Sequence, residues 1–325
     1  CMTKFDEIKE SISPELSRLN EIISSSLNSN SDLLNEIVAT YLKTKGKQIR
    51  PIIVILSAKF FSNINEETLH AAASIELLHN ASLIHDDVVD ETKKRRGNPT
   101  INSVWDNHIA VLVGDFFVSN ALSCAIAAGD MRVISTVSKL GKELSTGELD
   151  QIDIAKHHSI TEDNYYHIIG KKTASLFRSC VQVGGYTAKA PQQDIDNLAR
   201  FVELLGLCFQ IKDDIFDYFS DAEVGKPTGN DLREGKVTLP LIYALSKKES
   251  PLHEEMKSIV MQDVLTNAEI ERLIEFAKNE GGIEYAYSSM ERLKDEACKL
   301  ISHYPDSDAK KAFINLFDFI IKRHN

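Results

Sequence analysis

Apolar residues recur at three- and four-residue intervals along most of this chain, which is the period of an α-helix with one buried face. Residues 66–91 carry Leu69, Ala72, Ala73 and Leu77 on such a face, so the pattern predicts one long helix there. The same period predicts further helices over four stretches, 100–128, 131–154, 162–183 and 192–219. Because no alternating β-branched runs bounded by turn residues occur, we expect no substantial sheet.

Residues typical of helix ends separate these stretches. Asn65 precedes two glutamates and Thr161 precedes Glu162–Asp163, as at helix N-termini. Gly184–Gly185 is expected to end the fourth helix, because glycine is favoured just beyond a helix C-terminus.

Some stretches, such as 110–117, are apolar on more than one face, which indicates helices at the centre of a large bundle. No shift in composition marks a linker between domains. The expected fold is therefore all-α, a large single-domain helical bundle covering residues 1–325. Within it, 252–325 is expected to form peripheral C-terminal helices, because 252–307 is more polar than the rest.

Composition narrows the classes of function. The 325 residues include 48 acidic and 37 basic residues, a net charge of -11, and this excess of acid disfavours nucleic-acid binding. The five cysteines form no C-x-x-C pair and are expected to be free thiols in a reducing compartment. Without an N-terminal apolar signal or a run near the ~18 apolar residues of a spanning helix, we expect a cytoplasmic protein. Contact with a membrane surface is compatible with this composition.

Two aspartate clusters carry the clearest chemical signal. Both have the pattern Asp-Asp-x-x-Asp, and their six members are Asp86, Asp87, Asp90, Asp213, Asp214 and Asp217. Residues four apart share one face of a helix, so each cluster offers two carboxylates at one point. Carboxylate oxygens suit a hard divalent cation such as Mg²⁺. Each cluster follows an apolar run, so we expect both at the C-terminal ends of core helices, where carboxylates oppose the helix dipole.

A solvated acidic face is the alternative interpretation of one such cluster. Two copies 127 residues apart, each following an apolar helical run, favour metal binding instead. An EF-hand is disfavoured because neither copy has the spacing of that calcium loop.

Basic residues follow both clusters, where substrate phosphates on a bound Mg²⁺ would need them. Lys93, Lys94, Arg95 and Arg96 follow the first, and Lys226 and Lys236 follow the second. For Lys93 and Lys94, helix capping or ordinary solvation is the better explanation. For Arg95 and Arg96 we expect phosphate binding, because a planar guanidinium can bond two phosphate oxygens at once.

With these residues the chain resembles the trans-polyprenyl diphosphate synthases over about 45–240. The motifs that carry the resemblance are Gly46–Lys47–Gln48–Ile49–Arg50–Pro51, Glu76–Leu77–Leu78–His79, both aspartate clusters, Arg95–Arg96–Gly97, Val113–Gly114–Asp115–Phe116, Lys172–Thr173–Ala174, and Gly225–Lys226–Pro227 through Lys236. One departure is Lys45–Gly46–Lys47–Gln48, where the family usually has Gly-Gly-Lys-Arg.

The resemblance implies an isoprenoid-synthase bundle with a central cavity, a homodimer, and a role for each motif residue. Mg²⁺, for which Mn²⁺ can substitute, would be held on the allylic diphosphate by Asp86, Asp90 and Asp213, supported by Asp87, Asp214 and Asp217. The diphosphate of isopentenyl diphosphate would be bound by Lys47, Arg50, His79 and Arg96. The allylic diphosphate would be bound by Arg95, Lys172, Lys226 and Lys236. Thr173 and Gln210 would lie near the reacting carbons and, with Lys172 and the six aspartates, complete the catalytic group. For His79 a histidine satisfied within a helix bundle remains the alternative.

The implied chemistry is ionisation of the allylic C–O bond, attack by the isopentenyl double bond, and loss of a proton. Metal ions and basic side chains would stabilise the leaving diphosphate. No side chain is an obvious general base, so the departing diphosphate is the expected proton acceptor.

Residues four and five before Asp86 are Ser82 and Ala81, where short-chain members of the family carry bulky aromatics. Small residues one helical turn from the metal would leave room for a long prenyl tail. We therefore expect a long-chain product from a farnesyl or geranyl primer, possible contact with a membrane when product is released, and no nucleic-acid partner. The alternatives are a short-chain synthase, a terpene cyclase or squalene/phytoene-type synthase, a non-catalytic subunit of a hetero-oligomeric synthase, and a lipid-binding module.

Overall fold

The computed structural model describes residues 2–44, 46–220 and 228–324. In the N-terminal half its elements are α1 (Lys4–Ser11), α2 (Ser13–Ser26), α3 (Asp32–Leu42), α4 (Ile49–Phe61), α5 (Glu66–Val89), β1 (Lys94–Arg95), β2 (Asn98–Pro99), α6 (Ile101–Val104), α7 (Asn107–Ala127) and α8 (Met131–Lys156). The remaining elements are α9 (Glu162–Ile169), the π-helix η1 (Gly170–Ala174), α10 (Ser175–Thr187), α11 (Gln192–Phe216), α12 (Asn230–Arg233), α13 (Leu239–Leu245), α14 (His253–Val260), α15 (Asn267–Asn279), α16 (Gly282–Ile301) and α17 (Asp308–Lys322). The all-α prediction is confirmed; in the described residues the sheet is limited to the β1–β2 hairpin.

The chain divides into two compact units. Unit 1 comprises Cys1–Lys142, Leu176–Val202 and His303–Leu316, and unit 2 comprises Glu143–Ser175, Glu203–Ser302 and Phe317–Asn325. Their boundaries fall within or beside helices rather than in a linker, and a single domain over 1–325 remains a prediction.

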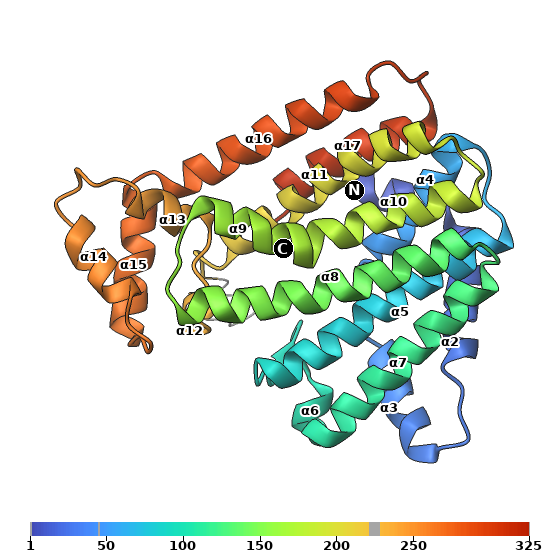
Figure 1. The fold of residues 1–325 in the computed structure, drawn as a ribbon, viewed down its shortest axis with the longest axis horizontal. Helices are drawn as coiled ribbons and strands as arrows, with labels where there is room; N and C mark the ends of the chain where they lie inside the picture. The colour runs from blue at the N-terminus through green and yellow to red at the C-terminus, as the bar shows by residue number, and fades with distance from the viewer. Residues whose placement is uncertain (1, 45, 221–227, 325) are drawn as a thin grey trace. The chain divides into compact units, whose positions relative to one another are not determined.

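Helix α5 is the centre of unit 1 and runs beside α7 (Figure 1). Its start was predicted correctly: Asn65 accepts a hydrogen bond from the N–H of Thr68, and the Thr68 hydroxyl closes a capping box. Close helix contact is visible at Ser74, whose hydroxyl donates to the carbonyl of Ala121 at 2.6 Å. Packing against α7 therefore fixes the position of α5, the helix whose C-terminal end carries the first aspartate cluster.

Two helix boundaries differ from the prediction. The stretch 100–128 is interrupted between α6 and α7, where the Asp106 side chain accepts from the N–H of Ile109 and starts a new helix. Gly184 and Gly185 do not end a helix but lie inside α10. A Cβ on Gly184 would be 2.7 Å from the Val54 carbonyl oxygen of α4, and one on Gly185 would be 2.6 Å from Cγ1 of Ile195 in α11, so the glycines permit close packing against both helices.

The helices of 252–325, whose peripheral position remains a prediction, bury substantial apolar faces. Within unit 1 the Phe313 ring is fully buried and contacts the rings of Phe60 and Phe201. In unit 2, helices α13–α15 share an apolar cluster that includes Leu241, Met256 and others. These helices are amphipathic: their polar face makes the segment polar on average, while their apolar face is buried.

Helix α7 is, among the described residues, the one helix long and apolar enough to cross a membrane by length and composition. Its apolar run is broken by polar residues, and Phe117 and Ala121 on one side are buried in unit 1. On the opposite side Val111, Leu122 and Ile126 are exposed. The described cysteines are free, as predicted, and three of them are buried.

Candidate active site

The first aspartate cluster lies at the C-terminal end of α5, as predicted, and Asp90 is the C-cap residue. Asp87 is buried, and its Oδ1 accepts a hydrogen bond from Nη2 of Arg95 at 2.6 Å. Asp86 and Asp90 are only half-buried. The middle carboxylate is thus neutralised within the protein, while its two neighbours remain partly accessible to a ligand.

Arg95 and Arg96 belong to the β1–β2 hairpin. Arg96 and Gly97 form its two-residue turn with φ of 52° and 77°, a left-handed pair typical of tight hairpins. The Arg96 guanidinium packs on Gly46, where a Cβ would lie 2.2 Å from Nη1. Glycine at position 46 therefore lets the 46–50 motif approach the hairpin, and the structure joins two motifs that are far apart in sequence.

A cluster of polar side chains in unit 1 comprises Glu76 and His79 of α5 and Arg50 of α4. Burial and the charges of Arg50, Arg96 and Arg95 lower the pKa of His79 well below its usual value, so the ring is neutral near pH 7. Burial raises the pKa of Glu76, and Arg50 opposes the shift. Arg50 stacks over the ring of Phe177 with 5.5 Å to the ring centre, and Lys47 is exposed. Arginine charges thus gather around one carboxyl and one neutral imidazole.

The second aspartate cluster lies at the C-terminal end of α11, also as predicted. Asp214 is buried and accepts hydrogen bonds from the Tyr165 hydroxyl at 2.5 Å and from the Gln210 amide at 2.8 Å. Gln210 in turn accepts a bond from the Thr173 hydroxyl at 2.9 Å. Burial, the largest cause, raises the pKa of Asp214 to about 7. The structure thereby links Thr173, Gln210 and the cluster into one hydrogen-bonded chain.

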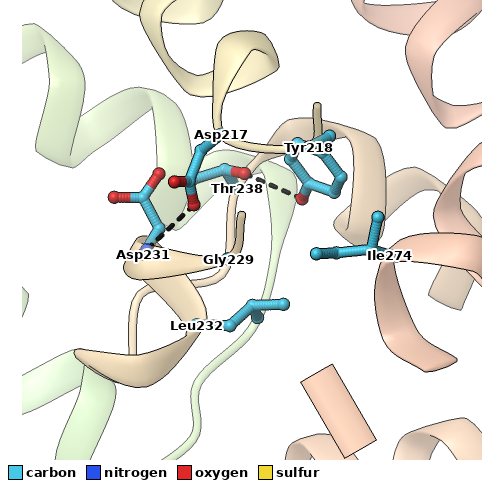
Figure 2. A pocket seen from close by; sticks show the side chains of 7 residues that line it. All are labelled: Asp217, Tyr218, Gly229, Asp231, Leu232, Thr238 and Ile274. Carbon is cyan, nitrogen blue, oxygen red and sulfur yellow. Dashed lines mark hydrogen bonds between the residues drawn. The ribbon is translucent and has the colours of Figure 1, made fainter. Parts of the chain in front are cut away.

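Asp217 performs a structural task in the same unit. Its two carboxylate oxygens accept hydrogen bonds from the backbone N–H groups of Asn230 and Asp231, at 3.1 and 2.9 Å, and so cap α12. Figure 2 shows this carboxylate above the start of α12, in a small pocket that is also lined by Tyr218 and Thr238. Burial and the nearby Asp214 and Asp217 raise the pKa of Asp231 well above its ordinary value.

The lysines assigned to phosphate binding in unit 2 already have acidic partners. Nζ of Lys172, on the π-helix, lies 2.5 Å from Glu148 and donates to Gln151 at 2.7 Å. Nζ of Lys236 lies 2.9 Å from Glu234. A π-helix is an irregular turn that often occurs at functional sites, and here it holds the Lys172–Thr173 pair. Lys226 lies outside the described residues.

The chain-length position Ala81 is 1% exposed and faces α7. It shares its face with Ser74, bonded to Ala121, and with His85, whose Nε2 lies 3.1 Å from the Val111 carbonyl oxygen. The two helices are therefore in close contact on both sides of Ala81, and its small size also serves their packing.

Ser82 is half-buried, and its hydroxyl donates to the His79 carbonyl at 2.6 Å. One turn earlier, Leu77 and Leu78 are buried and apolar. Ser82 is thus the less constrained of the two chain-length positions.

Several residues of these sites escaped the sequence analysis. Tyr165, Asp231, Glu148 and Arg323 have no local spacing that relates them to an aspartate cluster. Glu76 was part of a motif but received no role. Polar contacts between residues many helical turns apart, such as Tyr165–Asp214 or Asp217–Asp231, leave no periodic signal in the sequence.

The described residues contain no group of three or more acidic, histidine or cysteine side chains that could by itself enclose a metal ion. Each unit instead supplies partly exposed carboxylates at a helix end: Asp86 and Asp90 in unit 1, and Asp213 in unit 2. Taken separately, each of these incomplete oxygen donor sets fits Mg²⁺, which keeps waters and substrate oxygens as further ligands.

Comparison with known proteins agrees with this architecture. The polyprenyl synthetase family matches residues 31–277. The chain is 32% identical to the octaprenyl diphosphate synthase of Escherichia coli over 98% of both chains. A geranylgeranyl pyrophosphate synthase from Bacteroides thetaiotaomicron is 37% identical, covers 98% of this chain and 99% of its own, and superposes with a TM-score of 0.85. A polyprenyl synthase from Caulobacter crescentus, complexed with calcium and isoprenyl diphosphate, is 27% identical over 99% and 98% with a TM-score of 0.92.

The helical fold is that of the isoprenoid synthases. The chain belongs to the polyprenyl synthetase family and is a prenyl diphosphate synthase, a transferase of prenyl groups.

Proposed function

We propose that this synthase condenses isopentenyl diphosphate with farnesyl or geranyl diphosphate, releases diphosphate, and makes a long-chain all-trans polyprenyl diphosphate. The observation that carries the length assignment is the pair of small residues, Ala81 and Ser82, one turn before Asp86. The long-chain Escherichia coli relative supports it. The similar geranylgeranyl synthase keeps a short-chain product as the second candidate.

Asp86, Asp90 and Asp213 are the proposed ligands of Mg²⁺, with Mn²⁺ as a substitute. The calcium in the similar Caulobacter crescentus structure supports a divalent cation. When bound, the metal would offset the negative charge of the leaving diphosphate. Asp87, Asp214 and Asp217 support these ligands through their own bonds to Arg95, Tyr165 and the start of α12.

Four residues of unit 1 are proposed to bind isopentenyl diphosphate: Lys47, Arg50, His79 and Arg96. The arginine charges around the neutral His79 support an anion site, in which the imidazole can donate one hydrogen bond. The proposed residues for the allylic diphosphate are Arg95, Lys172, Lys226 and Lys236. Lys172 is held by Glu148, so a diphosphate must share or replace that partner.

Thr173 and Gln210 are proposed to face the reacting carbons. Their hydrogen-bonded chain ends on Asp214, whose raised pKa keeps much of it protonated at pH 7. Thr173 and Gln210 are themselves polar but uncharged and only weakly basic, so beside a carbocation they would not compete with the diphosphate for the proton.

Product analysis tests the length assignment. Purified protein is incubated with Mg²⁺, excess isopentenyl diphosphate and farnesyl diphosphate, and the dephosphorylated products are separated by chromatography. Chains well beyond 20 carbons are expected, whereas products that stop at 15 or 20 carbons would establish the short-chain alternative. Absence of condensation by the folded protein alone would favour a non-catalytic subunit.

Bulky substitutions sharpen this test. Ser82→Phe is expected to shorten the product to 15 or 20 carbons while condensation continues. Ala81→Phe should also shorten it but cost stability, because its ring must enter the α5–α7 contact. Unchanged product length in a folded Ser82→Phe variant would refute a tail path along α5.

We also propose a homodimer in the cytoplasm, with contact at a membrane surface when product is released. Exposed Val111, Leu122 and Ile126 on one side of α7 support an association surface. Sedimentation of the wild type beside Leu122→Glu tests it: the wild type should sediment as a dimer and the variant as a monomer.

A further inference from the structure

Arg323, just beyond α17, reaches the second aspartate cluster. Its Nη2 lies 2.6 Å from Oδ1 of Asp213 and donates a second bond to the Phe209 carbonyl at 3.0 Å. The guanidinium carbon is 4.2 Å from the Phe209 ring centre and 5.5 Å from that of Phe216. All four residues belong to unit 2.

The two ends of this ion pair differ in exposure. The Arg323 side chain is 7% exposed, whereas that of Asp213 is 40% exposed. A guanidinium enclosed by aromatic rings has lost most of its water, so its charge acts strongly on the carboxylate it touches. Within the described residues, Oδ1 of Asp213 takes this bond and Oδ2 receives none, which leaves Oδ2 for a cation.

The Asp-Asp-x-x-Asp pattern does not impose such a contact. In the first cluster the ion pair of Arg95 is formed with the middle residue, Asp87. In the second cluster the middle residue is bonded by Tyr165 and Gln210, and arginine reaches the first residue instead.

We propose that Arg323 is a positioning residue for Asp213. Arg323 holds the carboxylate by one oxygen and offsets its repulsion with Asp214 and Asp217, so that Oδ2 would be the oxygen available to a divalent cation. Hydrogen-bond partners of metal ligands orient the ligand and typically change metal affinity by about 10- to 100-fold. The inference rests on the proposed role of Asp213 as a metal ligand.

Binding of Mn²⁺ in the presence of inorganic diphosphate, followed by electron paramagnetic resonance of free Mn²⁺, tests this role without catalysis. Arg323→Gln is expected to weaken binding about 10- to 100-fold. Arg323→Lys, which keeps the charge but loses the planar fork, should restore part of the affinity. The matched control is Lys294→Gln, which breaks a 2.6 Å ion pair to Asp318 between α16 and α17 in the same unit. This control should bind Mn²⁺ like the wild type.

Three results would overturn the proposal. Unchanged Mn²⁺ affinity with only a lower Tm would make Arg323 purely structural, and tighter binding would make it a competitor of the cation. Equal weakening by Lys294→Gln would attribute the effect to general loosening of α17. If Arg323→Gln fails to fold, the Arg323→Lys affinity decides alone: wild-type or tighter binding refutes positioning. Asp213→Asn distinguishes failure of the Arg323 proposal from failure of the metal site on which it rests. Unchanged Mn²⁺ binding in that variant would refute the metal site itself.

Discussion

The two aspartate clusters have the same spacing and the same place at a helix C-terminus, yet the protein neutralises them in different ways. In unit 1 the middle residue, Asp87, pairs with the charged Arg95. In unit 2 the middle residue, Asp214, is bonded by the neutral Tyr165 and Gln210, and burial raises its pKa to about 7. One sequence pattern therefore supports two electrostatic environments, because the partner and not the motif sets the cost of a buried charge.

The last residue of each cluster differs as well. Asp90 is the C-cap of α5, whereas Asp217 caps the start of α12 with both oxygens. The second cluster is consequently tied to the 228–236 segment, which carries Lys236, and the first is tied to the arginine hairpin. We expect substitutions to separate these roles.

The largest effect is expected when either first aspartate loses its charge. Asp86→Asn and Asp213→Asn should each lower kcat by at least ~10²-fold, comparable to removing one strong electrostatic stabiliser from a reaction. Steady-state kinetics with saturating Mg²⁺, together with circular dichroism to confirm folding, measures this. Wild-type turnover in one folded variant would show that only the other cluster holds the catalytic metal.

The second effect concerns stability against pH in metal-free protein. Because the folded-state pKa of Asp214 lies above the ordinary 3.8, the folded protein keeps a proton between about pH 4 and 7 that the unfolded chain has lost. This contribution is fully present below pH 4 and is lost as the pH rises through 7. Relative to Asp214→Asn, the wild type should lose on the order of 3 kcal/mol over that range, since one pKa unit corresponds to about 1.4 kcal/mol.

Urea denaturation in EDTA at several pH values checks this prediction. Asp231, also buried with a raised pKa, should leave a residual slope in the variant. Parallel stability profiles for the wild type and Asp214→Asn would mean that Asp214 is ionised in the folded state, like an ordinary paired carboxylate.

The third effect tests whether the basic residues of the two units serve different substrates. Arg50→Ala should raise KM for isopentenyl diphosphate far more than KM for farnesyl diphosphate, by roughly 1.5–3 kcal/mol of lost charged hydrogen bonding. Lys172→Ala, the matched variant in unit 2, should show the opposite preference. Equal effects on the KM of both substrates in both variants would refute the proposal that Arg50 and Lys172 bind different diphosphates.

The smallest effect is expected at Asp217. Asp217→Ala removes two hydrogen bonds to the start of α12 and should lower the unfolding free energy by about 1 kcal/mol, as for other helix N-caps. Asp90 stands at the corresponding position of the first cluster, at the C-cap of α5, where a carboxylate opposes the helix dipole, so Asp90→Ala should lower stability less. Thermal denaturation of both variants measures the difference, and a larger loss for Asp90→Ala would reverse the comparison.

Local interactions made much of the structure predictable from the sequence. The α5 start at Asn65, the 3.6-residue apolar period, and the aspartates at both helix ends depend on neighbours within about four residues. The candidate residues themselves follow from motifs whose chemistry suits a metal and two diphosphates. These features can be predicted without knowing which distant segments come into contact in the folded protein.

Tertiary structure alone decided which aspartate is neutralised and by what. Tyr165 is 49 residues from Asp214, and Arg323 is 110 residues from Asp213. Tertiary packing also placed Gly184–Gly185 inside a helix, because close contact with α4 and α11, and not the end of a helix, requires glycine there. The physical reason is range: hydrogen bonds and caps within a turn are encoded by spacing, whereas burial and the charge that it permits depend on segments that meet only in the folded chain.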